Sequence, residues 1–309
     1  MTFLFTDIEG STRAWEEHQS ARGPSGMARG LARHNAIIAG VAASNSGSVF
    51  KTIGDAFCIA FWTAQDALAT AIDTQLTTVE DADRMIEATR RAGSVFLVDH
   101  TRNFDAAYVE ARRQVEAGAI GTLTRIVAHL CGRRAMLFRN HTHLLGSIRF
   151  FAGASPEWIF AALDAGFEDY GLEYRGEGGC DPMLDPGGTF VIHFANGVRA
   201  LVMASKGTPS TGVQIDLLRT RGRTVVGDQE TRAWTAAEDE GTLVPVPVTW
   251  AQGTTGDLGE RLVPAVGHLL DLVTAGGRSL SPPEEARNVL AMIHGALRSQ
   301  HDGMVRVRI

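Results

Sequence analysis

The first 75 residues alternate between short apolar runs and segments with a helical spacing of apolar residues. Residues 2–6, TFLFT, are typical of a buried strand, and apolar residues recur at spacings of three and four over 13–43. Two runs rich in β-branched and aromatic residues follow within 47–61, around a turn at Gly54, and predict a hairpin. With a helix expected over 64–75, this order is the first half of a split βαβ sandwich.

A different pattern starts at Thr78. Thr78 is expected to cap an amphipathic helix that Gly93 ends, and a continuous apolar run to His100 then predicts a strand. A second helix is expected over about 104–117. An alternation of helix and apolar strand is typical of α/β sheets.

From residue 123 the chain reads as longer strands joined by hairpins. Asn196-Gly197 and the region near Gly222 carry turn signals between alternating apolar residues. Further elements are expected as helices over about 144–152, 257–275 and 283–299 and as a closing strand over 304–309. The predicted fold class is therefore a composite α+β chain.

Three domains are predicted. Residues 1–76 are expected to form a ferredoxin-like half-domain, and residues 77–122 an α/β segment of the kind found in doubly wound sheets. Residues 123–309 are expected to form an α+β domain with a large, open, mostly antiparallel sheet.

Composition excludes several classes of protein. The chain has 309 residues, of which 44% are hydrophobic, but no apolar run of about 18 residues and no signal-like start, so we expect a cytoplasmic protein with no membrane partner. A net charge of -6 gives no basic surface, so no nucleic-acid partner is expected. The three cysteines are far apart and are expected to be reduced.

Two aspartates follow apolar strands at the start of the chain. If the first strand lies beside the hairpin, Asp7 and Asp55 meet at one edge of the sheet, and the carbonyl of Ile8 adds a third hard oxygen ligand for Mg²⁺. The turn Gly10-Ser11-Thr12 would offer backbone N–H groups to phosphates. The alternative is that both aspartates only stabilise turns beside glycine.

The segments FLFTDIEGSTRAWEEH and GSVFKTIGDAFCIAF resemble the first half of class III nucleotidyl cyclase catalytic domains, over residues 1 to about 75. The resemblance implies that Asp7 and Asp55 bind Mg²⁺ with the Ile8 carbonyl, and that Lys51 contacts adenine, so that the nucleotide triphosphate is ATP. A solvated lysine at a strand end is the alternative for Lys51. The residues that would face the triphosphate are Glu9, Gly10, Ser11 and Thr12.

One catalytic pair of that family is missing. In the family an Asn-x-x-x-Arg pair stabilises the transferring phosphoryl group. The chain has six asparagines, and the residue four positions on is in no case arginine. Loss of one such group typically costs about a hundredfold to a thousandfold in rate. We therefore expect Mg-ATP binding at most, without cyclase turnover.

Residues 78–309 resemble a second family, the Gfo/Idh/MocA oxidoreductases. The likeness is carried by TVEDADRMIEATRRAG, by HTRNFDAAYVEARRQVEAGAIGTLTRI and by RNHTHLLGSIRFFAGASPEW. It implies an NAD(P) cofactor, a sugar or polyol substrate and a C-terminal sheet through which a homo-oligomer forms.

The dinucleotide fingerprint of that family is absent. The phosphate-binding G-x-G-x-x-G motif has only one partial match, Gly176-Glu177-Gly178, with Asp181 in place of the third glycine. The family's Glu-Lys-Pro also has no counterpart before Val79, since the only lysines are Lys51 and Lys206.

His143 is the one catalytic candidate that the second resemblance carries over. The family often places acidic residues four before and three after this histidine, and here they are Arg139 and Gly146. An isolated histidine at this place is more often a helix cap or a satisfied core residue. A metal site combining His143 and His141 with His129 and Cys131 is disfavoured, because residues two apart share a face only on a strand.

The preferred interpretation is a composite chain that joins a truncated cyclase module to an oxidoreductase-like domain, without competent turnover. Two alternatives remain at this point. One is an NAD(P)-dependent oxidoreductase acting on a sugar or polyol. The other is a class III adenylate cyclase that is active only with a complementing partner chain.

Overall fold

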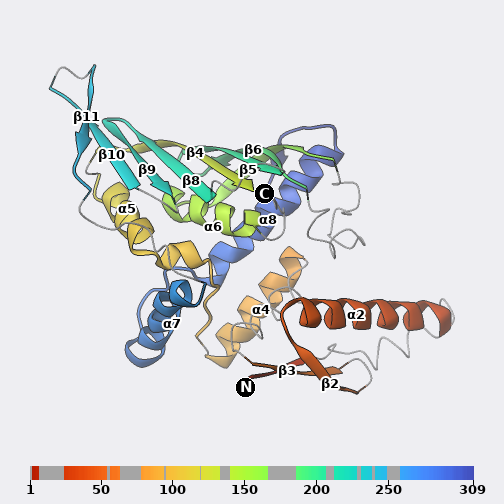
Figure 1. The fold of residues 1–309 in the computed structure, drawn as a ribbon. Coiled ribbons are helices and arrows are strands. Elements are labelled where there is room, and N and C mark those ends of the chain that lie inside the picture. The colour runs from red at the N-terminus through yellow and green to blue at the C-terminus, as the bar shows by residue number, and fades with distance from the viewer. Residues whose placement is uncertain are drawn as a thin grey trace. The chain divides into compact units, whose positions relative to one another are not determined.

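The computed structural model describes residues 2–6, 24–53, 56–62, 78–93, 95–118, 120–132, 140–165, 186–206, 212–227, 231–238, 241–248 and 258–309. The chain divides into two compact units, Met1–Thr77 and Thr78–Ile309 (Figure 1). Within the described residues, no helix is both long and apolar enough to cross a membrane.

The first unit contains a three-stranded antiparallel sheet and one long helix. Its described elements are β1 (Thr2–Thr6), α2 (Pro24–Ser44), β2 (Ser48–Ile53) and β3 (Ala56–Phe61). The strand order is β1-β3-β2, so the first strand pairs directly with the second strand of the hairpin, as the sequence predicted. One face of β3 packs under α2 through a small apolar cluster of Ile38, Ala42, Phe57, Ile59 and Phe61.

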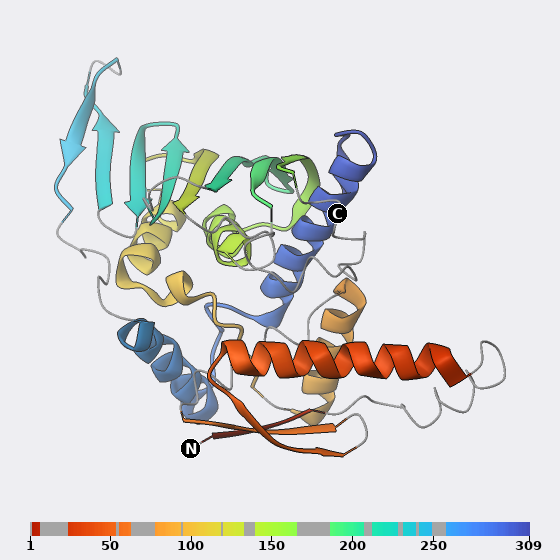
Figure 2. The same ribbon diagram turned by 45° about the vertical axis from the view of Figure 1, so that its right-hand side comes forward.

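The second unit is built on a nine-stranded sheet with the order β11-β10-β9-β8-β4-β7-β6-β5-β12. Its strands are β4 (Leu123–Gly132), β5 (Pro156–Leu163), β6 (Gly188–Phe194), β7 (Arg199–Lys206), β8 (Gly212–Arg219), β9 (Gly222–Gly227), β10 (Thr231–Ala236), β11 (Leu243–Val246) and β12 (Val307–Arg308). Figure 2 shows β9 to β11 extending the sheet at one edge. Among the described strands, β4 and β7 form the one parallel pair, which confirms the open, mostly antiparallel sheet.

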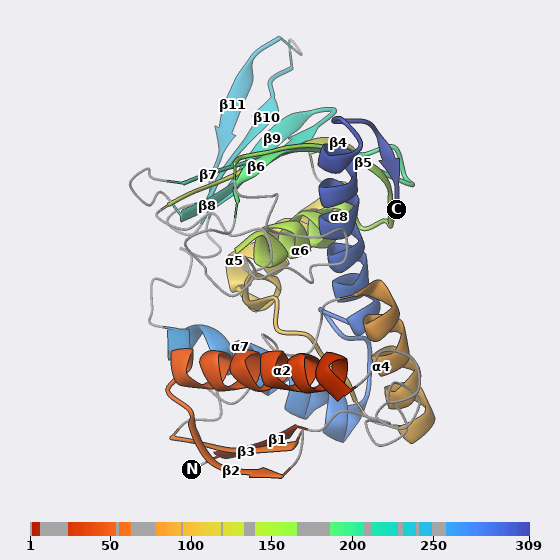
Figure 3. The ribbon, with the colours of Figure 1, turned by 90° about the vertical axis from the view of Figure 1, so that its right-hand side faces the viewer.

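Helices of the second unit cover one face of this sheet. Those that pack on the sheet are α5 (Ala106–Glu116), α6 (Asn140–Ala152) and α8 (Pro283–His301), whereas α4 (Val79–Ala92) packs on α8 and α7 (Leu258–Ala275) packs on the 3₁₀ helix η1 (Thr101–Phe104). Figure 3 shows α6 and α8 on the same side of the sheet. Alternate residues of the strands point to these helices, so that Phe190, Ile192 and Phe194 are fully buried with Phe150 and Ile148 of α6.

Helix α8 lies close against β5 because its residues are small or polar where the two meet. A Cβ atom at Gly295 would lie 2.7 Å from Cγ2 of Ile159. The backbone N–H of Ala161 donates to Oγ of Ser299 at 2.9 Å, and that of Leu163 donates to Oε1 of Gln300 at 2.8 Å. The short strand β12 pairs with β5 only at Trp158 and Ile159. Further along β5, side chains of α8 therefore accept the hydrogen bonds of the backbone N–H groups.

The opposite face of the sheet is not covered by these helices. On β7, Leu201 is 38% exposed and Met203 is 45% exposed, while Val202 between them is fully buried. Trp158 of β5 and His193 of β6 stack on the same sheet with ring centroids 5.2 Å apart. This face therefore carries apolar and aromatic side chains in contact with solvent.

The expectation of a strand after Gly93 is wrong. Residues 95–100 form neither helix nor strand, and the N–H of Val98 donates to the carbonyl of Ser281 at 3.2 Å. An apolar run forms a buried parallel strand only where neighbouring strands complete the ladder. The described residues before β4 supply no such neighbour, so the local pattern gave the wrong element.

Candidate functional sites

The register of the first unit brings the neighbours of both predicted metal ligands to one end of its sheet. Thr6, which precedes Asp7, lies opposite Phe57, and Ile53 pairs with Ala56 across the hairpin turn that contains Asp55. The sequence-predicted residues Asp7, Ile8, Glu9, Gly10, Ser11, Thr12 and Asp55 themselves lie outside the described residues. The described backbone thus agrees with the strand arrangement on which the predicted magnesium site depends.

Lys51 lies on the face of this sheet that α2 leaves uncovered. It pairs with Cys58 of β3, whereas the buried residues Phe57 and Ile59 face α2. Cross-strand partners point to the same side, so the exposed side chain of Lys51 shares the face of Cys58. A break in register between Val49 and Lys51 accompanies this placement. Lys51 is therefore accessible to a ligand on the open face.

His143 lies in the first turn of α6 and faces another histidine. Its ring is half-buried, and its centroid is 6.2 Å from that of His100, with the two rings at 81° to each other. Burial lowers the pKa of His143 to about 4, and the nearby charge of Arg102 lowers it further. His143 is therefore a neutral imidazole at physiological pH.

The sequence analysis missed His100, which is 5% exposed. Burial, followed by the influence of His143, lowers the pKa of His100 to about 3. Its Nδ1 lies 3.4 Å from Oγ of Ser281, at the segment that leads into α8. The only sequence signal was its place at the end of an apolar run, which marks burial but not contact with His143. Three residues on, in the adjoining 3₁₀ turn, Asn103 is fully buried, and neither polar atom of its side chain has a partner among the described residues.

The structure separates the residues of the disfavoured metal site. Cys131 and His129 lie on the outward side of β4, since the inward positions are held by Ala128 and Leu130. His141 is fully buried on the inner side and meets the edge of Phe190 with ring centroids 5.2 Å apart. Within the described part of the chain, no group of three or more His, Cys, Asp or Glu residues is arranged to hold a metal ion.

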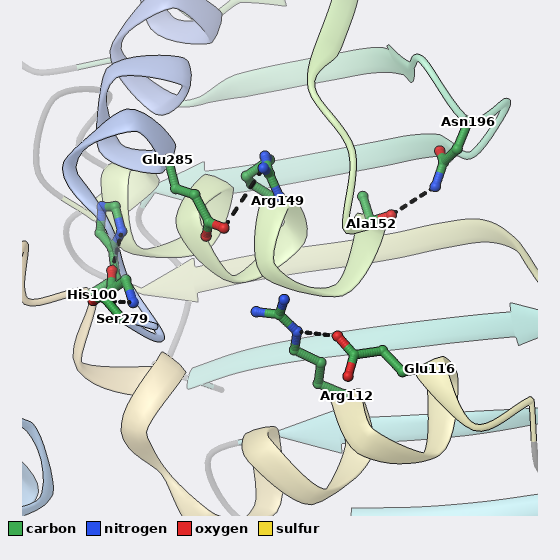
Figure 4. A network of polar contacts seen from close by, with 9 residues as sticks. His100, Arg112, Glu116, Arg149, Ala152, Asn196, Ser279 and Glu285 are labelled. Atoms are coloured by element: carbon green, nitrogen blue, oxygen red, sulfur yellow. Dashed lines mark hydrogen bonds and ion pairs between the residues drawn. The ribbon is translucent and has the colours of Figure 1, made fainter. Parts of the chain in front are cut away.

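A buried ion pair lies further along α6. Arg149 and Glu285 approach to 3.6 Å, and their side chains are only 12% and 8% exposed (Figure 4). Burial raises the pKa of Glu285 and lowers that of Arg149, while the attraction between the two charges opposes both shifts. Arg112 lies over the ring of Phe150 at 4.3 Å and pairs with Glu116 at 2.8 Å. These contacts join α5, α6 and α8. We therefore interpret the network as one that stabilises the fold.

A cavity of about 340 Å³ lies at the far end of α6, between the ends of α5 and α6, the start of β4 and the turn from β6 to β7. Its polar lining is occupied within the protein, since Nδ2 of Asn196 donates to the carbonyl of Ala152 at 2.8 Å (Figure 4). The cavity contains none of the predicted site residues.

The first part of the chain matches a known enzyme family in sequence. Residues 1–105 match the model of the adenylate and guanylate cyclase catalytic domain. A segment of 79 residues is 40% identical to a receptor-type adenylate cyclase of Trypanosoma congolense. That segment is 26% of this chain and only 10% of the trypanosome protein. The family match also runs beyond Thr77, into the second compact unit.

The fold of most of the chain is that of Gfo/Idh/MocA-type dehydrogenases. An oxidoreductase from Agrobacterium radiobacter, in complex with NAD⁺, L-tartaric acid and magnesium, is 18% identical, with 75% of this chain and 70% of that chain covered and a TM-score of 0.56. For aldose-aldose oxidoreductase of Caulobacter crescentus the values are 17%, 77%, 70% and 0.57. For levoglucosan dehydrogenase, in complex with NADH and levoglucosan, they are 17%, 80%, 76% and 0.60.

The described residues of the second unit do not fit a dinucleotide. A Rossmann domain places the cofactor at the ends of several parallel strands. The described strands here contain the single parallel pair β4 and β7, inside the antiparallel sheet. The partial glycine motif Gly176-Glu177-Gly178 lies outside the described residues. We therefore derive no chemical step through NAD(P).

Proposed function

We propose that this chain is a composite in which the N-terminal segment binds Mg-ATP without converting it and the C-terminal unit is a dehydrogenase-type domain without competent turnover. In this proposal residues 1–76 are a ferredoxin-like half of a cyclase domain and residues 77–122 a remnant of a Rossmann domain. Residues 123–309 are the substrate and oligomerisation domain. His143 remains the residue of that domain proposed to contact a bound sugar or polyol.

The register of the first sheet is the observation that supports Mg-ATP binding. Because Thr6 lies opposite Phe57, the chain segments that carry Asp7 and Asp55 leave the sheet at the same end. We propose that these two carboxylates and the carbonyl of Ile8 hold the magnesium ion of Mg-ATP. Lys51, exposed on the open face, is proposed to contact adenine.

The absence of turnover follows from the sequence. No Asn-x-x-x-Arg pair occurs in the chain, so the family's means of stabilising charge on the transferring phosphoryl group is missing. Removing one such donor slows related reactions by about a hundredfold to a thousandfold. Binding needs only the metal ligands and the base contact, so it survives this loss.

A calorimetric titration of the full chain with Mg-ATP tests the proposal. We expect saturable binding that Asp55→Ala abolishes and that Lys51→Ala weakens by about tenfold, the loss of one charged hydrogen bond. Glu87→Gln, an exposed change on α4, is the matched control and should leave binding unchanged. Equal binding by Asp55→Ala, or magnesium-dependent cyclic AMP formation by the chain alone, would contradict the proposal.

A cyclase completed by a partner chain is a second candidate. It is favoured by β2, which is an edge strand of the described sheet and whose residues Ser48 to Thr52 are all exposed. Such an edge can accept a strand of another chain. The test adds a full-length class III cyclase domain whose own metal-binding aspartates have been replaced. The mixture should then form cyclic AMP. The restored activity should disappear with Asp55→Ala.

A homo-oligomer through the C-terminal sheet is also proposed. The open face of β7 carries Leu201 and Met203, which are 38% and 45% exposed. Exposed apolar side chains on a large sheet face are typical of a protein interface. Light scattering should show an oligomer that Met203→Glu dissociates, whereas Ser205→Glu at the rim of the same face should have a smaller effect.

A further inference from the structure

Gly146 occupies a position in the middle of α6 where helix propensity disfavours glycine. The structure gives the reason for its presence. A Cβ atom built on Gly146 would lie 2.8 Å from Cγ and 2.9 Å from Nδ1 of His100. The imidazole of His100 therefore packs directly on the backbone of α6, and only glycine leaves it room. Gly146 follows His143 by three residues, so both positions lie on one helix face.

We propose that His100 is the positioning partner of His143 and fills the place beside it that an acidic side chain at position 146 would otherwise occupy. The proposal rests on the suggested role of His143 as the ligand contact of the second unit. It concerns only how that imidazole is held and which charge it carries. It does not depend on the binding of Mg-ATP.

His100 is fixed from several sides. Its carbonyl accepts the N–H of Asn103 at 2.7 Å, and its Nδ1 lies 3.4 Å from Oγ of Ser281. The neighbouring Val98 donates its N–H to the carbonyl of Ser281 at 3.2 Å, so the backbone on the two sides is also joined. With 5% of His100 exposed, its ring has little freedom to leave the space above Gly146. A ring held in this way fixes the edge-to-face arrangement with His143.

Burial keeps both rings neutral, and a nearby positive charge adds to its effect. Burial is the main cause that lowers the pKa of each histidine, and the positive charge of Arg102, from η1, lowers that of His143 further. On the adjoining segment, burial raises the pKa of Asp99, whose Oδ2 accepts a bond of 3.4 Å from Oγ1 of Thr101. Among the described residues, no carboxylate is hydrogen-bonded to either ring. Within this part of the chain, no carboxylate therefore stabilises an imidazolium at the pair.

The replacement of an acid by an imidazole changes what His143 can do. A carboxylate partner stabilises the imidazolium form and so allows a histidine to take a proton from a substrate. A neutral imidazole partner gives no such stabilisation, so His143 offers a hydrogen bond to an uncharged hydroxyl group and does not retain a proton at neutral pH. The site is suited to binding and not to general-base catalysis.

Nitrogen-15 NMR of the histidine side chains in the full chain tests the partnership. In the wild type we expect His143 to titrate near pH 4. The double variant His100→Ala/Gly146→Asp places a carboxylate on the face of His143, and the proton affinity of His143 should rise by about a hundredfold, or two pKa units. His100→Phe fills the same space without adding a carboxylate, so the low titration of His143 should remain.

The packing of His100 on Gly146 is tested separately by thermal unfolding. Gly146→Ala should lower the melting temperature, and His100→Ala in the same chain should restore part of it, because the clash is removed. An unchanged titration of His143 in the double variant would overturn the proposal, as would a Gly146→Ala protein as stable as the wild type. Neither readout requires a ligand. If His143→Gln leaves the binding of a probe polyol such as myo-inositol unchanged while these results hold, the proposed ligand role fails and the partnership stands.

Discussion

The two units differ in what each preserves of a known enzyme. The first carries the motif residues of a cyclase domain on a small sheet with a small apolar cluster. The second carries the fold of a dehydrogenase on one large continuous core, but with Arg139 and Gly146 where the family often has acids. A fold depends on many interchangeable apolar contacts, whereas a site depends on a few groups of fixed chemistry. The fold of the second unit therefore rests on its core and does not depend on which residues stand at positions 139 and 146.

The largest effect is expected from the core of the second unit. Phe194 of β6 is fully buried in this core, with 0% of its surface accessible to solvent. Phe194→Ala should lower the free energy of unfolding of this unit by about 3–5 kcal/mol, measured by denaturant unfolding with tryptophan fluorescence. Leu201→Ala on the open face is the control and should cost well under that.

The same variant can break the comparison. If the two units are separable, Phe194→Ala should leave the Mg-ATP affinity of the first unit unchanged under conditions in which the second unit is partly unfolded. Parallel loss of nucleotide binding would mean that the first unit depends on the core of the second. The comparison of a motif-bearing unit with a fold-bearing unit would then be wrong.

A smaller loss is expected from the buried ion pair of α6 and α8. Glu285→Ala leaves Arg149 buried without its partner, and such a change typically costs about 3 kcal/mol. The double variant Arg149→Met/Glu285→Leu should recover most of this loss, because it removes both buried charges. A double variant as unstable as the single one would show that the pair itself, and not the orphaned charge, supports the fold.

Local signals predicted local structure well. Thr78 and Gly93 mark the two ends of α4, where Gly93 has a φ of +62°. Asn196-Gly197 forms the turn between β6 and β7, where the φ of Gly197 is +85°. These signals act through the backbone of a few neighbouring residues, so they are visible in the sequence.

Contacts between distant segments were not predictable in the same way. His100 meets Gly146 and Ser281 only because α6 and the segment before α8 fold onto the same side of the sheet. Arg149 and Glu285 are similarly brought together by packing of α6 against α8. The site of the first unit is predicted from its motif alone, and it stays a prediction, since all of its residues except Lys51 lie outside the described residues.

Acid should destabilise the second unit through its histidines. Because the folded-state pKa values of His100 and His143, about 3 and 4, are below the usual value of 6.5, the unfolded chain binds protons first. The stabilisation is complete above about pH 6.5 and is lost as the pH falls towards 4, at about 1.4 kcal/mol per pH unit for each histidine. Denaturant unfolding between pH 7.5 and pH 5 measures this slope.

Variants isolate the histidine contribution from that of the carboxyl groups. Burial raises the pKa of Asp99 and of Glu285, so these groups make the folded state bind protons more readily and oppose the loss in acid. The difference between wild type and His100→Phe removes their contribution, and the variant should show the shallower slope. His301→Gln, at an exposed position, should keep the wild-type slope. A slope unaffected by His100→Phe would mean that His100 is not a buried neutral imidazole.

The smallest effect concerns the border between the two regions. The cyclase family match covers α4, yet α4 belongs to the second compact unit and is tied to α8 by Asp83 and Arg287, with bonds of 2.8 and 3.0 Å. This pair is partly exposed, so Asp83→Asn should cost under about 1 kcal/mol and less at high salt. Hydrogen exchange of the α4 amides measures the change, which should be confined to that helix.

Glu87→Gln, whose partner Arg91 lies on α4 itself, should not alter the docking of α4. Equal exchange in Asp83→Asn and wild type would place the attachment of α4 elsewhere and move the border that separates the motif from the fold.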